Sequence, residues 1–208
     1  MPVDKGGLVE LSRQDLLKIY PFFGEESLFV DSLSAQKTDA GEVGDRAIGT
    51  WFIPRRITEQ HFRDFAGRGG RMVEDLRLIP GHFWAEALGQ ALGALAYLKH
   101  PEHVMDVLPT FEKAHSGYKE AGFPGDRIDL CVELISNETD ERGRFKLKGR
   151  GAAVFNERTL ATVEPIEVRT IPLAVAMRAL QGLRTSHQNE PRVAHGLKIS
   201  PNIFYLNE

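Results

Sequence analysis

The middle of the chain is apolar on nearly every side of a segment with helical spacing. This segment runs from Gly81 to Leu98 after Pro80, and Lys99, His100 and Pro101 follow it. A helix that is apolar all round is buried in a core and does not lie on a surface. We therefore predict a long buried helix that begins at Pro80-Gly81, with glycines and alanines that let strands approach closely.

Alternating apolar and polar residues on both sides of this helix predict strands. The segments with this pattern run from Ser27 to Leu33, Val43 to Ile53, Ile128 to Leu134, Arg144 to Phe155 and Thr159 to Thr170. A turn around Ala40-Gly41 joins the first two into a hairpin. One buried helix among several antiparallel strands indicates an α+β domain in which an antiparallel β-sheet wraps around a long central helix.

Two shorter helices are predicted outside this unit. Ser12 and Asp15 have the spacing of a capped helix start, ahead of an apolar stripe that ends at Pro21. Residues 173–180 read as an amphipathic helix, followed by a polar, irregular tail. We expect a main domain over residues 1–171, and a C-terminal helix with a tail over 172–208.

Composition narrows the possible functions. The formal net charge of −3 gives no reason to expect nucleic-acid binding, and no apolar run is long enough to span a bilayer. The segment from Met1 to Gly7 lacks the layout of a secretory signal, so we expect a cytoplasmic protein. Cys131, in an alternating strand pattern, is better explained as a small apolar residue than as a nucleophile.

Glu86 is the residue of chemical interest, because it is an ionisable group on an otherwise apolar helix. Burial of a carboxylate raises its pKa, which would let Glu86 hold a proton near neutral pH and act as a general acid. The alternative is a structural carboxylate that a neighbour satisfies.

Two neighbours share the helix face of Glu86. Gln90, one turn later, could hold Glu86 by a side-chain hydrogen bond, and His82 lies one turn earlier. His82 and Glu86 could be half of a metal site, but no third ligand is evident, so we expect no metal and no cofactor. Unpaired backbone N–H groups near Gly81 could stabilise an oxyanion at the start of the helix.

These residues resemble a motif of the 3-hydroxyacyl-[acyl-carrier-protein] dehydratases of the hot-dog superfamily. Pro80-Gly81, Glu86-Ala87 and Gln90 match its Pro-Gly-x-x-x-x-Glu-Ala-x-x-Gln, and His61-Phe62 match the start of its His-Phe-Pro-Gly. The resemblance covers about residues 12 to 170. It includes the segments from Tyr20 to Asp31, Tyr118-Lys119, Phe123 to Asp126 and Lys148 to Glu164.

The resemblance implies a hot-dog fold and a hydro-lyase of fatty acid biosynthesis or related lipid metabolism. It would dehydrate a 3-hydroxyacyl thioester, carried on acyl-carrier protein or CoA, to the trans-2-enoyl thioester. His61 would remove the C2 proton, Glu86 would assist departure of the C3 hydroxyl, and the Gly81 amide would bind the thioester carbonyl. Phe62, His82 and Gln90 would line the substrate site. In that family the histidine and the carboxylate meet across a subunit interface, which implies a homodimer or a larger assembly of dimers.

The chain departs from the family pattern after His61-Phe62. Arg63-Asp64 replace Pro-Gly, and an inserted loop of about residues 63–79 precedes Pro80. We favour His61 as the catalytic histidine, with His82 as the alternative. A hot-dog thioesterase, an enoyl-thioester hydratase and a non-catalytic acyl-thioester binding protein remain as other functions.

Overall fold

The computed structural model describes residues 7–21, 23–54, 65–66, 72–73, 79, 81–101, 107–141 and 144–179. Its elements are β1 (Leu8–Ser12), α1 (Arg13–Ile19), the 3-10 helix η1 (Glu25–Ser27), β2 (Ser32–Lys37), β3 (Val43–Phe52), β4 (Phe65–Ala66), β5 (Met72–Val73), α3 (Gly81–Lys99), β6 (Val107–Tyr118), β7 (Arg127–Thr139), β8 (Phe145–Phe155) and β9 (Arg158–Pro172).

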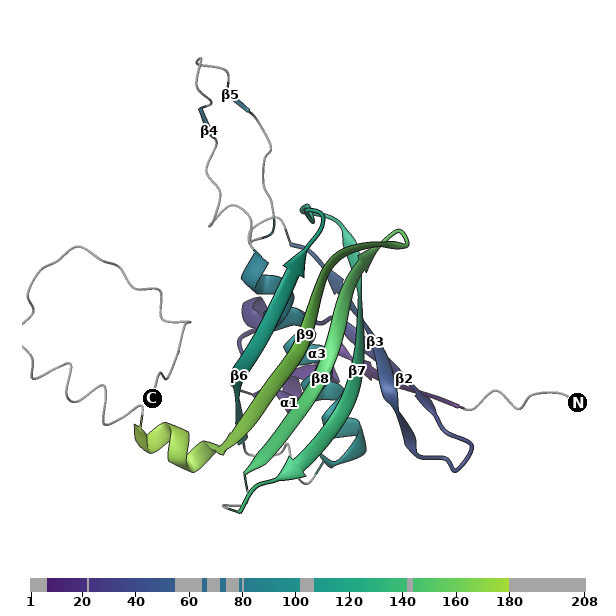
Figure 1. Cartoon of the computed structure of the whole chain (residues 1–208), viewed down its shortest axis with the longest axis vertical. Coiled ribbons are helices and arrows are strands. Elements are labelled where there is room, and N and C mark those ends of the chain that lie inside the picture. The colour runs from purple at the N-terminus through teal and green to yellow at the C-terminus, as the bar shows by residue number, and fades with distance from the viewer. Residues whose placement is uncertain are drawn as a thin grey trace, which may run out of the picture. The chain divides into compact units, whose positions relative to one another are not determined.

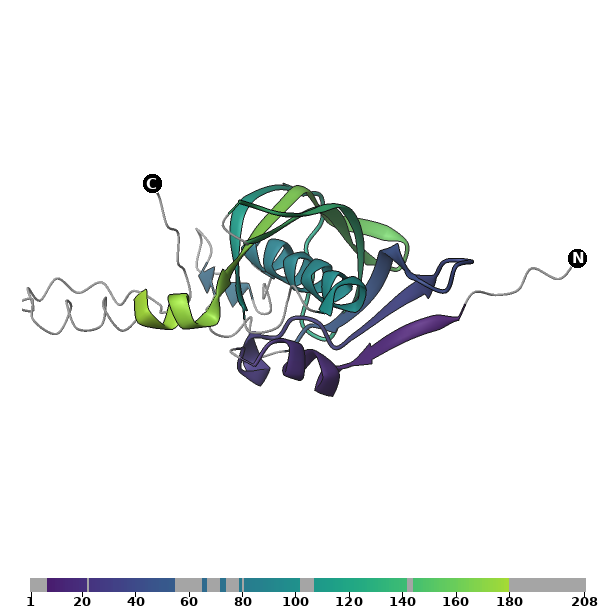
Figure 2. The same ribbon diagram turned by 90° about the horizontal axis from the view of Figure 1, so that it is seen from below.

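An antiparallel sheet of 7 strands forms the framework, in the order β1-β2-β3-β7-β8-β9-β6. The sheet curves around α3 (Figures 1 and 2). On the inner side of the sheet, α3 contacts β2, β3, β7, β8, β9 and β6. The expectation of an α+β domain with a sheet wrapped around a central helix is thus confirmed.

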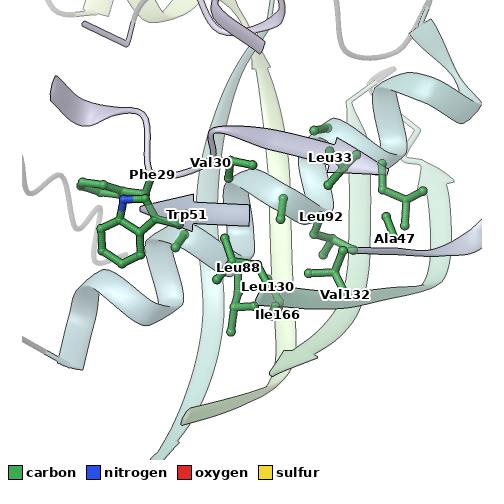
Figure 3. Close-up of a cluster of buried hydrophobic side chains, with 14 of the residues drawn as sticks. Phe29, Val30, Leu33, Ala47, Trp51, Leu88, Leu92, Leu130, Val132 and Ile166 are labelled. Atoms are coloured by element: carbon green, nitrogen blue, oxygen red, sulfur yellow. The ribbon is translucent and has the colours of Figure 1, made fainter. Parts of the chain in front are cut away.

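The core lies between α3 and the sheet, and strand glycines let the helix come close. Leu88 and Leu92 of α3 are fully buried among strand side chains such as Leu130 and Ile166 (Figure 3). A Cβ atom on Gly149 would lie 2.7 Å from a Leu92 methyl carbon and 2.7 Å from the carbonyl oxygen of Glu133. Burying a leucine contributes about 1.5–3 kcal/mol, so this contact helps to hold the helix against the sheet.

The predicted elements are largely present. The Ser12 hydroxyl and the Asp15 carboxylate form a capping box at the start of α1, and α3 begins at Gly81. The three strands predicted after the helix correspond to β7, β8 and β9. β1 and β6 were not predicted from the sequence.

One strand prediction was wrong in position. Ser27 to Leu33 was expected to be extended and paired, whereas η1 ends at Ser27 and the strand runs from Ser32 to Lys37. Leu28, Phe29 and Val30 are buried as their apolar character requires. The backbone N–H of Phe29 donates to the side chain of Gln90 on α3 and not to a neighbouring strand.

The prediction that α3 is buried all round was also too broad. Glu86, Gly93 and Tyr97 are half-buried and His82 is exposed, on one stripe of the helix. The sheet covers the opposite side, where Leu88 and Leu92 point. The candidate chemistry therefore lies on the side of α3 that the sheet leaves partly open.

A short two-stranded ladder and a C-terminal unit complete the chain. Within the predicted insertion, β4 and β5 pair as a short antiparallel ladder. The chain divides into two compact units, Met1–Leu173 and Ala174–Glu208, and residues 173–179 are helical. Over the described ranges, we find no helix with the length and apolar character needed to cross a membrane.

Candidate active site

Glu86 lies on the second turn of α3, in the half-buried stripe. Burial raises the pKa of its carboxyl group above the usual value, and a hydrogen bond from Gln90 partly opposes this effect. A carboxyl group with a raised pKa is suited to donate or accept a proton near neutral pH. The environment that the sequence predicted for Glu86 is therefore present.

Gln90 is almost fully buried, and both the oxygen and the nitrogen of its side-chain amide form hydrogen bonds. Its Nε2 donates to Oε1 of Glu86 at 3.1 Å and to the carbonyl oxygen of Ser27 at 2.9 Å. Its Oε1 accepts a hydrogen bond from the N–H of Phe29 at 2.8 Å. The two backbone partners fix which end of the amide faces Glu86, so Gln90 presents a donor to it.

This contact distinguishes the two oxygens of the Glu86 carboxyl group. Because Oε1 accepts from Gln90, Oε2 is the oxygen better placed to carry or transfer a proton. The expected hydrogen bond between Gln90 and Glu86 is thus confirmed.

Tyr20, immediately after α1, supports the same part of the helix. Its hydroxyl donates to the backbone carbonyl of Gln90 at 2.6 Å, and the side chain is buried. A Cβ atom on Gly93 would lie 2.5 Å from this hydroxyl, so the glycine makes room for it. Burial, and to a smaller extent the charge of Glu86, raises the pKa of the Tyr20 phenol, which therefore stays neutral.

Gly81 is the first residue of α3, where backbone N–H groups have no partner within the helix. The ring of Tyr118, from the end of β6, lies against it: a Cβ atom on Gly81 would be 2.6 Å from Cζ of Tyr118. A side chain at position 81 would clash with this ring. The helix start thus combines a positive dipole end with a glycine that lets the Tyr118 ring lie close to the backbone.

Aromatic side chains support the first turns of α3. Phe29 packs against Phe83 and Trp51, with ring centroids 5.0 and 5.3 Å apart, and Trp51 packs against Trp84 at 5.8 Å. The Phe29 and Trp51 rings lie together at the end of the core cluster in Figure 3. These contacts hold the beginning of the helix against the sheet and the segment before β2.

The other candidate site residues from the sequence are His82, His61 and Phe62. His82 is exposed, and its ring packs on that of Phe83 with centroids 4.4 Å apart. His61 and Phe62 lie outside the described residues. Three or more possible metal ligands do not cluster anywhere in the described part of the chain.

Cys131 lies on β7 as expected. Burial, followed by the charge of Asp129, raises the pKa of its thiol. A reactive cysteine needs a lowered pKa, which agrees with the interpretation of Cys131 as part of the sheet.

Tyr20 and Tyr118 were named from the sequence only as part of the family resemblance, and no role in the site was predicted for them or for the backbone groups of Ser27 and Phe29. The glycines were the available signal, because glycine inside a helix is unfavourable and often marks a close neighbour. Gly93 makes room for Tyr20, and Gly89 makes room for Phe111 of β6. The sequence did not identify which residues would fill these spaces.

Comparison with known proteins places the fold. No protein-family model and no curated protein sequence matches the chain. A mutant of the fluoroacetyl-CoA-specific thioesterase FlK matches its structure with a TM-score of 0.50 and 17% identity, over 70% of this chain and 99% of that one. The dehydratase heterocomplex ApeI:P from Xenorhabdus doucetiae matches with a TM-score of 0.50 and 13% identity, over 72% of this chain and 86% of that one. The chain therefore has the hot-dog fold.

Proposed function

We propose that this protein is an enzyme that acts on acyl thioesters, with Glu86 as a reacting carboxyl group. The observation that carries the proposal is Glu86 itself, a half-buried carboxyl with a raised pKa, held by Gln90 and close to the helix start at Gly81. Matching structures include a fluoroacetyl-CoA thioesterase and a dehydratase complex, which supports thioester chemistry on this fold.

The reaction we favour is dehydration of a 3-hydroxyacyl thioester on acyl-carrier protein or CoA. His61 would take the proton from C2, and the resulting negative charge would move onto the thioester oxygen near the Gly81 amide. The bond from C3 to oxygen would then break as Glu86 donates its proton, releasing water and the trans-2-enoyl thioester. A carboxyl group whose pKa is raised by burial suits this role, which is why we place dehydration first.

Thioester hydrolysis is the second candidate. The fluoroacetyl-CoA-specific thioesterase matches the fold as well as the dehydratase complex does, with the same TM-score of 0.50. In this reaction an ionised Glu86 would activate a water that attacks the thioester carbonyl. The reverse reaction, hydration of an enoyl thioester, would use the same groups as dehydration.

We also propose a homodimer. β6 forms one edge of the sheet and has β9 as its partner strand in the described part of the chain. No described strand pairs with its other edge, and such edges favour the addition of another chain. The mass in solution, measured by light scattering, should be twice the 23.3 kDa of one chain or a higher even multiple.

Product analysis tests the reaction. The purified protein is incubated with a 3-hydroxyacyl thioester and with the matching saturated acyl thioester, on both carriers, and enoyl product and free thiol are measured by mass spectrometry. Enoyl thioester without free thiol supports dehydration, whereas free thiol from both substrates supports hydrolysis. Tight acyl binding without any product would contradict an enzyme and indicate a binding protein.

His61→Ala tests the assignment of the histidine. We expect it to lose at least about 100-fold in turnover, as removal of a general base normally does. His100→Ala, just beyond the end of α3 that is far from Gly81, is the matched control and should keep the activity. If His61→Ala keeps full turnover and His82→Ala loses turnover, His82 would be the catalytic histidine.

A further inference from the structure

The orientation of Gln90 depends on a short segment far from α3 in the sequence. Gln90 contacts the carbonyl of Ser27, the last residue of η1, and the N–H of Phe29, which lies between η1 and β2. Neither group belongs to a regular strand ladder. Something else must therefore hold residues 25–31 in the shape that Gln90 requires.

Arg13, the first residue of α1, makes the contacts that could do this. Its Nη1 donates to Oδ1 of Asp31, and its Nη2 donates to the carbonyl oxygens of Glu25 and Leu28. Ser27 lies between the first two carbonyl partners in the chain, and Phe29 lies between Leu28 and Asp31. One guanidinium group thus ties the segment on both sides of the groups that Gln90 contacts.

Both Asp31 and the helix that carries Arg13 are held in place by the rest of the fold. Asp31 accepts a hydrogen bond from the N–H of Phe52 at 2.6 Å through Oδ2, and its own N–H donates to Thr50 at 2.7 Å. These bonds join the segment to β3. The helix that carries Arg13 is capped by Ser12, and its Leu16 side chain is fully buried.

We propose that Arg13 is a positioning residue for Glu86, acting through residues 25–31 and Gln90. The catalytic meaning of this role rests on the proposed function of Glu86, whereas the connection itself rests on the hydrogen bonds above. Arginine suits the role because its planar group directs several donors at fixed angles. Lysine, with one compact ammonium group, cannot reach the same three oxygens together.

Loss of Arg13 should change the titration of Glu86. Once the segment loosens, Gln90 no longer keeps its donor on Oε1 of Glu86, and the contact that lowers the pKa of this carboxyl is weakened. Among the described residues, Tyr20 is a neighbouring titratable group from outside α3, and its pKa responds to the charge of Glu86. His82 lies one turn before Glu86 on α3. Its titration must be followed in the same experiment.

The test uses the full-length protein with ¹³C-labelled glutamate carboxyl groups. The Glu86 signal is identified by its absence in Glu86→Gln and is followed against pH by NMR. For Arg13→Gln we expect the pKa of Glu86 to rise by roughly 0.5 to 1 pH unit, the effect of losing about one hydrogen bond. Arg13→Lys should give a smaller rise, and Asp31→Asn should change it in the same direction.

The control is Lys18→Gln, which removes an exposed ion pair with Asp15 on the same helix. It should leave the titration of Glu86 unchanged. The proposal is overturned if Glu86 titrates as in the wild type, within about 0.2 pH unit, in every folded variant of Arg13 and Asp31. If Arg13→Gln does not fold, Arg13→Lys and Asp31→Asn decide the question by the same criterion.

Activity measured on the same variants separates the two proposals. If the wild type turns over thioesters, the limb of its pH–rate profile that Glu86 sets should move with the NMR pKa in Arg13→Gln. An inactive wild type with a shifted Glu86 titration would reject the proposed function and keep the positioning role. An active wild type in which the Arg13 and Asp31 variants leave the Glu86 titration unshifted would keep the proposed function and reject the positioning role.

Discussion

Gln90 donates a hydrogen bond from Nε2 to Oε1 of Glu86 over 3.1 Å, one helical turn apart on α3. Burial raises the pKa of Glu86, and this hydrogen bond acts in the opposite direction. The carboxyl group therefore stays in place with a proton affinity above the usual value. Such a group lowers stability when it is ionised, which gives the first prediction.

Glu86→Gln should stabilise the fold at neutral pH. A carboxyl whose folded pKa is raised makes the folded state less stable as pH rises above its unfolded value, here 4.5, because the unfolded chain then ionises more readily. The glutamine removes this effect and can still accept from Gln90. Thermal midpoints should favour the variant at pH 7, and the two proteins should become more alike near pH 4. A variant that is less stable at pH 7 and equal near pH 4 would contradict the raised pKa.

Gln90→Ala should destabilise the protein. The substitution leaves the N–H of Phe29 and the carbonyl of Ser27 without their partner in a buried place. Each buried polar group left unpaired costs about 1–3 kcal/mol, so we expect a loss of about 2 kcal/mol or more in urea unfolding. Gln36→Ala, at an exposed position on β2, is the control and should change stability little. Equal effects of the two substitutions would mean that Gln90 does not hold the segment.

The local part of the site could be predicted because it depends on spacing within one helix. Glu86 and Gln90 lie one turn apart, so their contact follows from helix geometry. The partners of Gln90 at Ser27 and Phe29 are backbone groups more than sixty residues away, which no pattern of side chains indicates. The apolar run beside them was read as a strand because buried loops and buried strands share the same composition.

β6 was missed for a different reason. Its ladder with β9 shifts register between Phe111 and Lys113 and again between Ala114 and Ser116. Each shift breaks the alternation of inward and outward residues on which strand prediction depends. β7 alternates without a register shift from Arg127 to Leu134, which covers the segment predicted from Ile128 to Leu134, and it was found.

Gly89 and Phe111 should be energetically coupled. A Cβ atom on Gly89 would lie 2.1 Å from Cζ of the Phe111 ring, which must then move. Glycine to alanine in a helix is otherwise worth about 1 kcal/mol of stability. We expect Gly89→Ala to stabilise the Phe111→Ala protein by about this amount and the wild type by clearly less. Urea unfolding of the four proteins gives the coupling, and its absence would contradict the contact.

Glu133 should contribute an acid-sensitive part of the stability. Arg150, and then Arg46, donate hydrogen bonds to its carboxylate and lower its pKa below the ordinary 4.5. The contribution is therefore present above pH 4.5 and is lost as pH falls through the lowered folded value. The difference in thermal midpoint between wild type and Glu133→Gln should be steady above pH 5 and shrink towards pH 3.

Glu138→Gln, an exposed position on the same strand, serves as the control for Glu133. It should give a small difference at every pH in this range. A Glu133→Gln difference that stays constant down to pH 3 would show that the ion pairs with Arg150 and Arg46 do not stabilise the fold.

The role of Glu86 as a reacting group is tested most directly by the turnover number of Glu86→Gln on the acyl thioester that the wild type converts. The variant keeps the size and the hydrogen bond of the side chain, and circular dichroism verifies its fold. We expect the turnover number to fall by at least about 100-fold, the usual contribution of a positioned general acid or base. A folded Glu86→Gln protein with a turnover number within about twofold of the wild type would contradict this role.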